Sequence, residues 1–234
     1  MITDMANPLR PIAASVLVCL SAILAAQSPS ASEEVARLRE ATTILHDVMK
    51  GADTAIPDSI LMRAEGIAVF PSTIKAGFIF GGMRGRGVLS ARTDKGWSPP
   101  TFMTLTGGSF GLQAGGQATD IVFVIMNRRG LENFIKNQFK FGADASAAAG
   151  PVGRDLQAGT DLQMRAEILS YSRARGLFAG VTVNGSTVTT DTDGNYRFYD
   201  TRFNSTQIVV GGLAGSPESV REWQEALAKY APPR

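Results

Sequence analysis

A glycine-rich stretch from Gly66 to Arg92 places the strongest constraint on what this chain can fold into. It begins with an apolar run, Gly66 to Phe70, which Pro71 and Ser72 stop. A second apolar run, residues 76–80, leads into the glycine-dense segment Gly81 to Gly87. Short apolar runs bounded by residues that break regular structure are typical of buried strands. We therefore expect strands here, the first of them ending at Pro71.

The same stretch carries positive side chains that an extended backbone would align. If residues 84–92 form a strand, Arg84, Arg86 and Arg92 share one face, because side chains alternate with a period of two. Lys75 lies just before the second run. In one interpretation, the glycines let an anionic group approach the backbone while arginine supplies paired donors. In the other, which these residues alone favour, the glycines mark bulges and bends and the arginines are solvated.

The composition is that of a globular protein without a strong charge bias. The chain has 234 residues, of which 44% are hydrophobic and 19% charged, and its net charge is +2. A chain of this length can bury the core of one large domain or two small ones, and the composition argues against disorder. A strongly basic nucleic-acid binder is excluded, so any anion site must be local.

The first 31 residues are typical of a secretory signal peptide. A short polar segment with Arg10 as its positive charge precedes an apolar run, Ile12 to Ala26, and a small, polar segment, Gln27 to Ser32. This is the order of a cleaved export signal. The apolar run is shorter than the roughly 20 residues of a membrane-spanning helix, although an uncleaved anchor stays open. We expect cleavage within residues 26–32 and a periplasmic or extracellular location.

The single cysteine, Cys19, lies inside that apolar run. Lipid attachment at Cys19 is the less favoured alternative, because the residue before a lipidated cysteine should be small and Val18 is not. Removal of the leader would leave a mature chain without cysteine. Such a chain has neither a disulfide nor thiolate chemistry.

Helices are expected near both ends of the mature chain. After Ser32, apolar residues recur at spacings of three and four, which predicts an amphipathic helix ending near Lys50. Its polar face carries both signs of charge, so packing on a sheet is favoured over insertion into lipid. A final helix is expected over residues 216–230, with Pro217 at its first position. Shorter helical segments are expected over residues 57–62 and 130–139.

Further strands and turns complete the expected fold. Apolar runs predict strands at residues 101–105, 121–126, 167–172 and 176–183. Residues 141–155 are a run of small side chains with helix-favouring alanines but glycine and proline at both ends, and we predict a strand there as well. Hairpin turns are expected at residues 93–96 and at Asn184-Gly185. No internal repeat or long linker is present. We predict a single domain over residues 32–234 of the α+β class, an antiparallel sheet (a sandwich or a partly closed barrel) with packed N-terminal and C-terminal helices.

Nine sequence blocks, taken in order along the chain, resemble a known family. They are Gly66–Pro71, Lys75–Phe78, Gly85–Leu89, Gly96–Ser98, Ser109–Gln113, Gly142–Ser146, Ala149–Asp155, Ile168–Arg173 and Gly176–Gly180. On these blocks the chain resembles the SYLF domain family, a lipid-binding module also called the actin-binding domain of certain yeast Src-homology-3 proteins. The resemblance runs from about Val35 to Tyr199 and looks like the stand-alone exported form found in bacteria. It implies a non-enzymatic domain that binds membrane lipids, with phosphoinositides preferred in the eukaryotic members.

The resemblance also implies which residues hold lipid. Lys75, Arg86, Arg154 and Arg173 stand at basic positions of the family blocks, and Arg175 stands where the family has Lys or Arg. Together with Arg84 they form the predicted lipid-binding set, and Phe78 and Phe80 are predicted to contact acyl chains. Lipid binding in the family has also been associated with a basic N-terminal helix, whereas the corresponding helix here is nearly neutral. An exported protein would not meet actin or cytosolic phosphoinositides, so the natural ligand stays open.

Enzymatic functions find little support in the residues. His46 is the only histidine, and no G-x-S-x-G motif is present, so a nucleophilic triad is not expected. Asp191 to Gly194 resembles the start of a calcium loop, but the closing glutamate is absent and a hairpin turn is favoured. Acid–base pairing within the following set is not required by its spacing: Asp144, Asp155, Asp161 and Glu167.

The leading hypothesis is an exported, non-enzymatic protein that binds anionic membrane lipids, with no cofactor, no metal and no nucleic-acid partner. The alternative from another class is a structural or interaction protein of the envelope that binds a protein or glycan partner. A hydrolase that acts through carboxylates is the third hypothesis.

Overall fold

The computed structural model describes residues 29–51, 55–77, 80–110, 117–136, 138–153, 165–174, 177–212, 214 and 217–234. Most of the predicted signal peptide, including Cys19, lies outside these residues. So do the following candidate residues: Phe78, Arg154, Asp155, Asp161 and Arg175. The side chains of Lys75 and Phe80 also lie outside the description.

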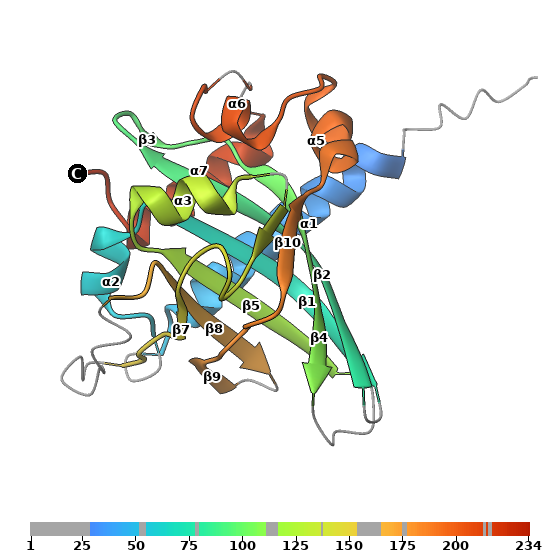
Figure 1. The fold of residues 1–234 in the computed structure, drawn as a ribbon. Coiled ribbons are helices and arrows are strands. Elements are labelled where there is room, and N and C mark those ends of the chain that lie inside the picture. Colours follow the sequence, from blue (N-terminus) through green and yellow to red (C-terminus); the bar gives the residue numbers. More distant parts are fainter. Residues whose placement is uncertain are drawn as a thin grey trace, which may run out of the picture.

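One strongly curled sheet runs through the centre of the molecule (Figure 1). Its strands follow the spatial order β6-β10-β4-β2-β1-β5-β8-β7, while β3 pairs with β2 and β9 with β8. All these pairs are antiparallel except β7 with β8. The α+β prediction is confirmed in the form of a half-barrel rather than a sandwich. The strands are β1 (Gly66–Gly77), β2 (Phe80–Thr93), β3 (Gly96–Trp97), β4 (Thr101–Phe110), β5 (Gln117–Ile125), β6 (Gln138–Lys140), β7 (Ala147–Ala149), β8 (Ile168–Ala174), β9 (Leu177–Gly180) and β10 (Thr187–Thr190).

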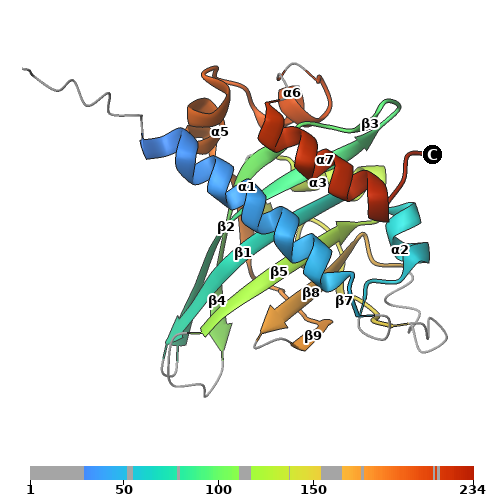
Figure 2. The ribbon, with the colours of Figure 1, turned by 180° about the vertical axis from the view of Figure 1, so that it is seen from behind.

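Helices cover both faces of the sheet. The described helices are α1 (Pro29–Val48), α2 (Asp58–Arg63), α3 (Arg128–Phe134), α5 (Thr192–Tyr199), α6 (Ser205–Val209) and α7 (Glu218–Tyr230). Figure 2 shows α1 and α7 crossing one face, and α3 lies over the other face in Figure 1. Among the described residues, no helix combines the length and apolar character needed to cross a bilayer. The predicted N-terminal and C-terminal helices are confirmed as α1 and α7, and both pack on the sheet.

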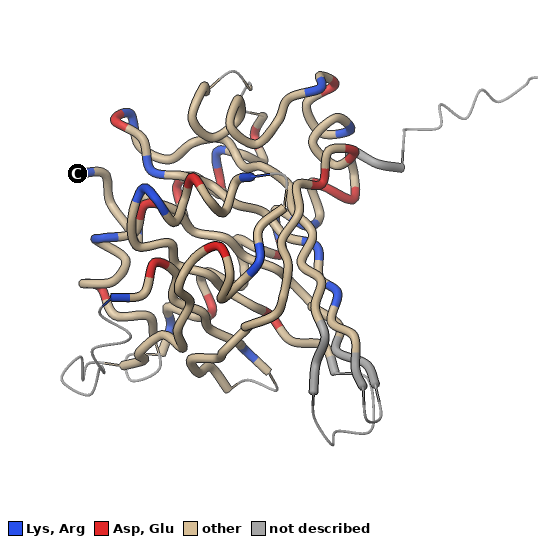
Figure 3. The backbone as a smooth tube through the Cα atoms, in the orientation of Figure 1, with Lys and Arg blue, Asp and Glu red and all other residues tan. Residues whose placement is uncertain are grey.

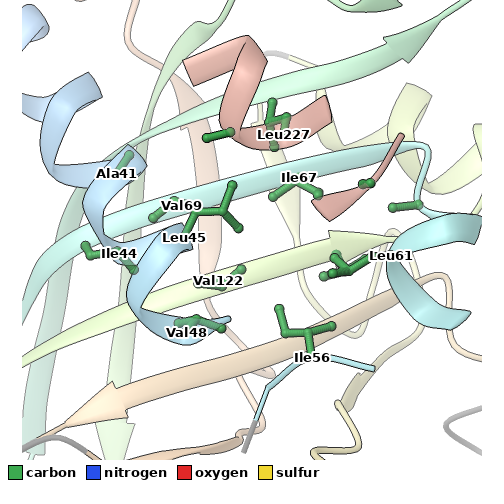
Figure 4. Packing of buried hydrophobic residues seen from close by; sticks show 14 of the residues in the cluster. Ala41, Ile44, Leu45, Val48, Ile56, Leu61, Ile67, Val69, Val122 and Leu227 are labelled. Atoms are coloured by element: carbon green, nitrogen blue, oxygen red, sulfur yellow. The ribbon is translucent and has the colours of Figure 1, made fainter. Parts of the chain in front are cut away.

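The two faces of the sheet bury separate apolar clusters. Along β1, Ile67 and Val69 point toward α1 and α7, whereas Ala68 and Phe70 join the cluster on the α3 side. Figure 4 shows the first cluster, with Leu45 of α1 lying over the central strands. A strand buried on both faces has no polar face, which explains why this segment reads as a continuous apolar run.

Strand β1 does not end at Pro71, contrary to the prediction. Its pairing with β2 joins Val69 to Val88 and then Ile74 to Arg84, so five steps along β1 match four steps along β2. One extra residue in a strand is a β-bulge, which bends the strand without ending it. Ser72 adopts a positive φ of 45° at this point. The second apolar run is consequently divided between the end of β1 and the start of β2.

Two glycines of β2 make room for this bulge. A Cβ atom at Gly87 would lie 2.5 Å from the Val69 carbonyl oxygen and 2.6 Å from the Phe70 ring. A Cβ atom at Gly85 would lie 2.2 Å from Oγ1 of Thr73. Gly82, by contrast, is exposed and has no atom within 4 Å of such a position. The interpretation that the glycines mark a bulge therefore holds for Gly85 and Gly87.

Other sequence predictions need correction in their boundaries. The helix expected over residues 130–139 ends at Phe134, and residues 138–140 form β6 instead. Asn127 starts this helix by accepting a hydrogen bond from the Gly130 N–H at 2.7 Å. Of the strand expected over residues 141–155, the described part contains only the three residues of β7, because a turn occupies residues 142–144. Helix α7 begins at Glu218, with Pro217 as its N-cap rather than its first residue.

Two predicted hairpin turns have other roles. Asn184 and Gly185 do form a turn, with φ of 80° at Gly185, but it leads into β10. That strand pairs with β4 and β6 rather than with β9. The turn expected at residues 191–194 is wrong, because Asp191 is the N-cap of α5 and accepts the Gly194 N–H at 2.9 Å. An aspartate at this position satisfies a helix amide that otherwise has no partner.

We expect the Gly87→Ala substitution to lower the free energy of unfolding by about 2 kcal/mol or more, because the added methyl group overlaps the bulge. Gly82→Ala is the matched control and should change it by less than about 0.5 kcal/mol. Chemical denaturation followed by circular dichroism measures both values. Equal stability of the two variants would show that the bulge does not need a glycine opposite it.

Candidate functional site

A groove of about 500 Å³ opens where α1 crosses the β1 bulge. The bulge residue Ser72 donates from Oγ to Glu40 of α1 at 2.9 Å, and from its backbone N–H to Asp120 of β5 at 3.0 Å. These contacts hold the helix, the bulge and the neighbouring strand in one arrangement. The residues that line the groove are Glu33, Ala36, Arg37, Glu40, Pro71, Ser72, Ile74, Arg84, Gly85 and Arg86.

From the groove outward, no helix in the described part of the chain covers this face of the sheet (Figure 2). Arg84 of β2, Ile74 of β1 and Ala118 of β5 lie side by side in register. All three are exposed, and Ile74 keeps 58% of its surface accessible. This row, which we call the open strip, therefore presents a cation beside an aliphatic side chain.

Arg84 and Arg86 differ in how far neighbouring acids neutralise them. Arg86 pairs with Glu33 at 3.2 Å, and its Nε lies 3.9 Å from Asp191. Within the described part of the chain, Arg84 forms no ion pair and no side-chain hydrogen bond. Figure 3 shows positive and negative residues interspersed over the molecule.

A buried charge network lies behind the groove. Glu34 is fully buried and accepts hydrogen bonds from Arg37 at 3.2 Å and from Arg197 at 2.8 Å. Arg37 also donates to Asp191 at 3.2 Å, and its guanidinium lies over the Phe102 ring. Burial lowers the pKa of Arg37, whereas the hydrogen bond to Glu34 raises the pKa of Arg197. The network fastens α1 to α5.

Sequence reasoning missed this network. The spacing of Glu34 and Arg37 by three residues on one helix was the one available signal, because such side chains are neighbours on a helix surface. Asp191 and Arg197 lie more than 150 positions away along the chain, as the separations of 154 and 163 show. No local pattern brings residues so far apart together.

Arg173 joins three elements through two carboxylates. It pairs with Asp47 of α1 at 2.8 Å and with Asp120 of β5 at 2.8 Å. Burial tends to lower the pKa of Arg173, but the hydrogen bonds to these two acids outweigh it and raise the pKa. Hydrogen bonds from Lys50 and Arg173 in turn lower the pKa of Asp47. This predicted lipid contact is thus already engaged with protein carboxylates.

Arg92 shares the face of Arg84 and Arg86, as its spacing predicts, but it is buried at the far end of the strand. It donates to the carbonyl oxygens of Ala64 at 2.7 Å and Leu61 at 3.1 Å, and to that of Ala231. Burial lowers its pKa. Because helix C-termini expose unpaired carbonyl groups, Arg92 serves to join the ends of α2 and α7.

The remaining candidate groups have structural partners. Nδ1 of His46 lies 2.8 Å from the Tyr230 hydroxyl, which joins α1 to α7. Asp144 accepts the Lys140 N–H at 2.6 Å, and Glu167 accepts the Ser146 N–H at 3.2 Å. In the described ranges, no group of three or more His, Cys, Asp or Glu side chains is placed to hold a metal ion.

Comparison with known proteins identifies relatives that share much of this chain. The profile of the Ysc84 family, described as "Las17-binding protein actin regulator", matches residues 106–230, more than half of the chain. "LAS seventeen-binding protein 3" of Saccharomyces cerevisiae is 34% identical over 171 residues, or 71% of this chain. "Protein YSC84" of the same yeast is 33% identical over 188 residues, or 76%.

An animal protein is similarly related. "SH3 domain-containing YSC84-like protein 1" of Bos taurus is 31% identical over 195 residues, or 82% of this chain. The matches cover 37%, 40% and 56% of the three relatives' own lengths. Each relative therefore contains a large part that the match does not include.

Adjacent glutamates on α1 provide a direct test of the buried network. We expect Glu34→Gln to lower the free energy of unfolding by about 3 kcal/mol, because it leaves the buried Arg37 and the partly buried Arg197 without a full counter-charge. Glu33→Gln removes a partly exposed ion pair and should cost less than about 1 kcal/mol. Urea denaturation of the two variants measures the difference. A small loss for Glu34→Gln would mean that the network is not needed for stability.

Proposed function

Because this chain belongs to the Ysc84 family, also known as the SYLF domain family, we propose that it is a non-enzymatic protein that binds anionic phospholipid head groups at a membrane surface. The names of its relatives point to binding and regulation rather than catalysis. The observation that carries the lipid proposal is the open strip, where Arg84 has no acidic partner among the described residues and lies beside exposed Ile74.

The chemistry of the strip suits a lipid surface better than a small soluble anion. A guanidinium donates two hydrogen bonds to phosphate oxygens in parallel, and an aliphatic side chain gains by leaving water among lipid tails or glycerol groups. Each basic residue near an anionic membrane contributes about 1 kcal/mol. Arg86 adds a second, partly paired cation on the same strand face.

The predicted set is divided by these contacts. Arg84 and Arg86 are the proposed head-group contacts. Arg173 would bind a head group only after giving up its pairs with Asp47 and Asp120. The following residues remain sequence-based predictions: Lys75, Phe78, Phe80, Arg154 and Arg175.

Vesicle flotation tests the proposal. The protein should float with vesicles of phosphatidylcholine and phosphatidic acid, and much less with phosphatidylcholine alone. The double variant Arg84→Ala/Arg86→Ala should bind about thirtyfold more weakly at low ionic strength, since two contacts of about 1 kcal/mol each are lost. The loss should shrink as salt is added, because salt screens exposed charges.

The matched control removes two exposed arginines from the opposite face of the sheet. Arg128→Ala/Arg129→Ala on α3 deletes the same charge and also breaks two ion pairs, an exposed one with Glu132 and one with the largely buried Glu167. An equal loss of vesicle binding in both double variants would show that only the net charge of the protein matters, and not the position of Arg84 and Arg86. Equal recovery of the wild-type protein with neutral and anionic vesicles would contradict the proposal that it recognises the charge of the lipid head group.

A protein or glycan partner of the envelope is the second candidate, favoured by the relatives that are named as binding proteins. The open strip would then meet a macromolecular surface instead of lipid. A photo-cross-linker placed at Ile74 distinguishes the two, because it labels whatever covers the strip in the native envelope. Adducts with a single protein and none with lipid would favour this candidate.

We also propose that the protein is exported, on the basis of the composition of residues 1–31. The mature protein should lack its first 25 to 31 residues or so, the range set by the expected cleavage region. Intact-mass measurement of the protein from the envelope fraction of its native host checks this. Recovery of the full-length chain from the cytosol would contradict export.

A further inference from the structure

We propose that Glu33 is a built-in competitor of the lipid phosphate, so that a head group binds Arg86 by displacing this carboxylate. The inference rests on the proposed lipid-binding function and adds a residue that opposes it. It follows from the contrast between the two acids that approach Arg86 and from the position of Arg84 beside them.

The two acids are held very differently. Asp191 keeps 12% of its side-chain surface exposed, accepts a hydrogen bond from Arg37 and caps α5 through the Gly194 N–H. It cannot leave without disturbing the buried network. Glu33 is 57% exposed and lies 3.2 Å from Arg86, which is itself 45% exposed. Glu33 is therefore the acid that can rotate into solvent at little cost.

The groove places the second cation where an exchange becomes favourable. Glu33, Arg84 and Arg86 all line it, and the two arginines lie two residues apart on one strand face. Glu33 pairs with Arg86 and leaves Arg84 without a partner in the described part of the chain. A phosphate that bridges both guanidinium groups breaks one exposed ion pair and makes two charge-assisted contacts. The phosphate can therefore displace Glu33 from Arg86, because it binds Arg84 at the same time.

This exchange predicts an effect that runs against an ordinary structural role. If the Glu33–Arg86 ion pair only supported the fold, breaking it would either weaken lipid binding or leave it unchanged. A competing carboxylate instead strengthens binding when it is neutralised, and it does so only while Arg86 is present. The sign of the change and its dependence on Arg86 are thus both diagnostic.

The experiment is a double-mutant cycle in the full chain. The probe is a vesicle of phosphatidylcholine with phosphatidic acid, and the variants are Glu33→Gln, Arg86→Ala and their combination. Glu33→Gln should tighten binding about three- to fivefold, the range expected for freeing one exposed ion-pair partner. In the Arg86→Ala background, Glu33→Gln should increase affinity for the vesicles no more than a control substitution that removes one exposed carboxylate elsewhere. Circular dichroism confirms that each variant is folded.

The control is Glu132→Gln, which makes the same charge change and frees Arg128 from an exposed pair at 3.1 Å on α3. A gain for Glu33→Gln that does not exceed this control, or that persists undiminished without Arg86, overturns the inference. If the wild-type protein still prefers anionic vesicles, the proposed function then stands alone. If neither the wild-type protein nor Glu33→Gln binds anionic vesicles, both proposals fail.

Discussion

The bulge in β1 is the constraint on which the rest of the site depends. Without it, Pro71 would end the strand beneath α1, and the sheet would have no row of residues beyond the helix. The bulge lets β1 continue to Gly77. The bulged backbone needs extra space opposite it, and Gly85 and Gly87 provide that space because they lack side chains. Asp120 secures the bent backbone by accepting the Ser72 N–H. The groove and the open strip are consequences of this local geometry.

Several charged side chains of this protein connect elements of the fold. Arg92 joins two helix ends, Arg173 connects α1 to β5 and β8, and a fully buried Glu34 gathers two arginines. Since a buried charge is costly unless paired, these side chains are committed to the fold. Arg84 and Arg86 instead lie at the uncovered end of the sheet, where their side chains are exposed. The proposed function therefore depends on Arg84 and Arg86 more than on the full set of basic residues at family positions.

Membership of the Ysc84 family and the observed contacts bear on different questions. The family profile and the relatives' names indicate a binding domain, and they are associated by name with Las17 and actin. The contacts indicate which side chains of this chain are available for binding. An exported member that binds lipid would use the same scaffold with a surface of its own, because the sheet and its two buried faces do not depend on the open strip.

Local periodicity determined much of this fold. The apolar spacing of α1 and α7 and the apolar run of β5 lie within single elements, so the sequence alone predicted them, together with the antiparallel α+β class and the shared face of Arg84, Arg86 and Arg92. Three matters were decided only by tertiary structure. Pro71 marks a bulge rather than a strand end because Gly85 and Gly87 lie opposite. Asp191 begins a helix rather than closing a hairpin because α5 packs against α1 and β4. The three arginines of one face differ because a helix covers one end of the strand and not the other, and burial depends on partners that no local pattern specifies.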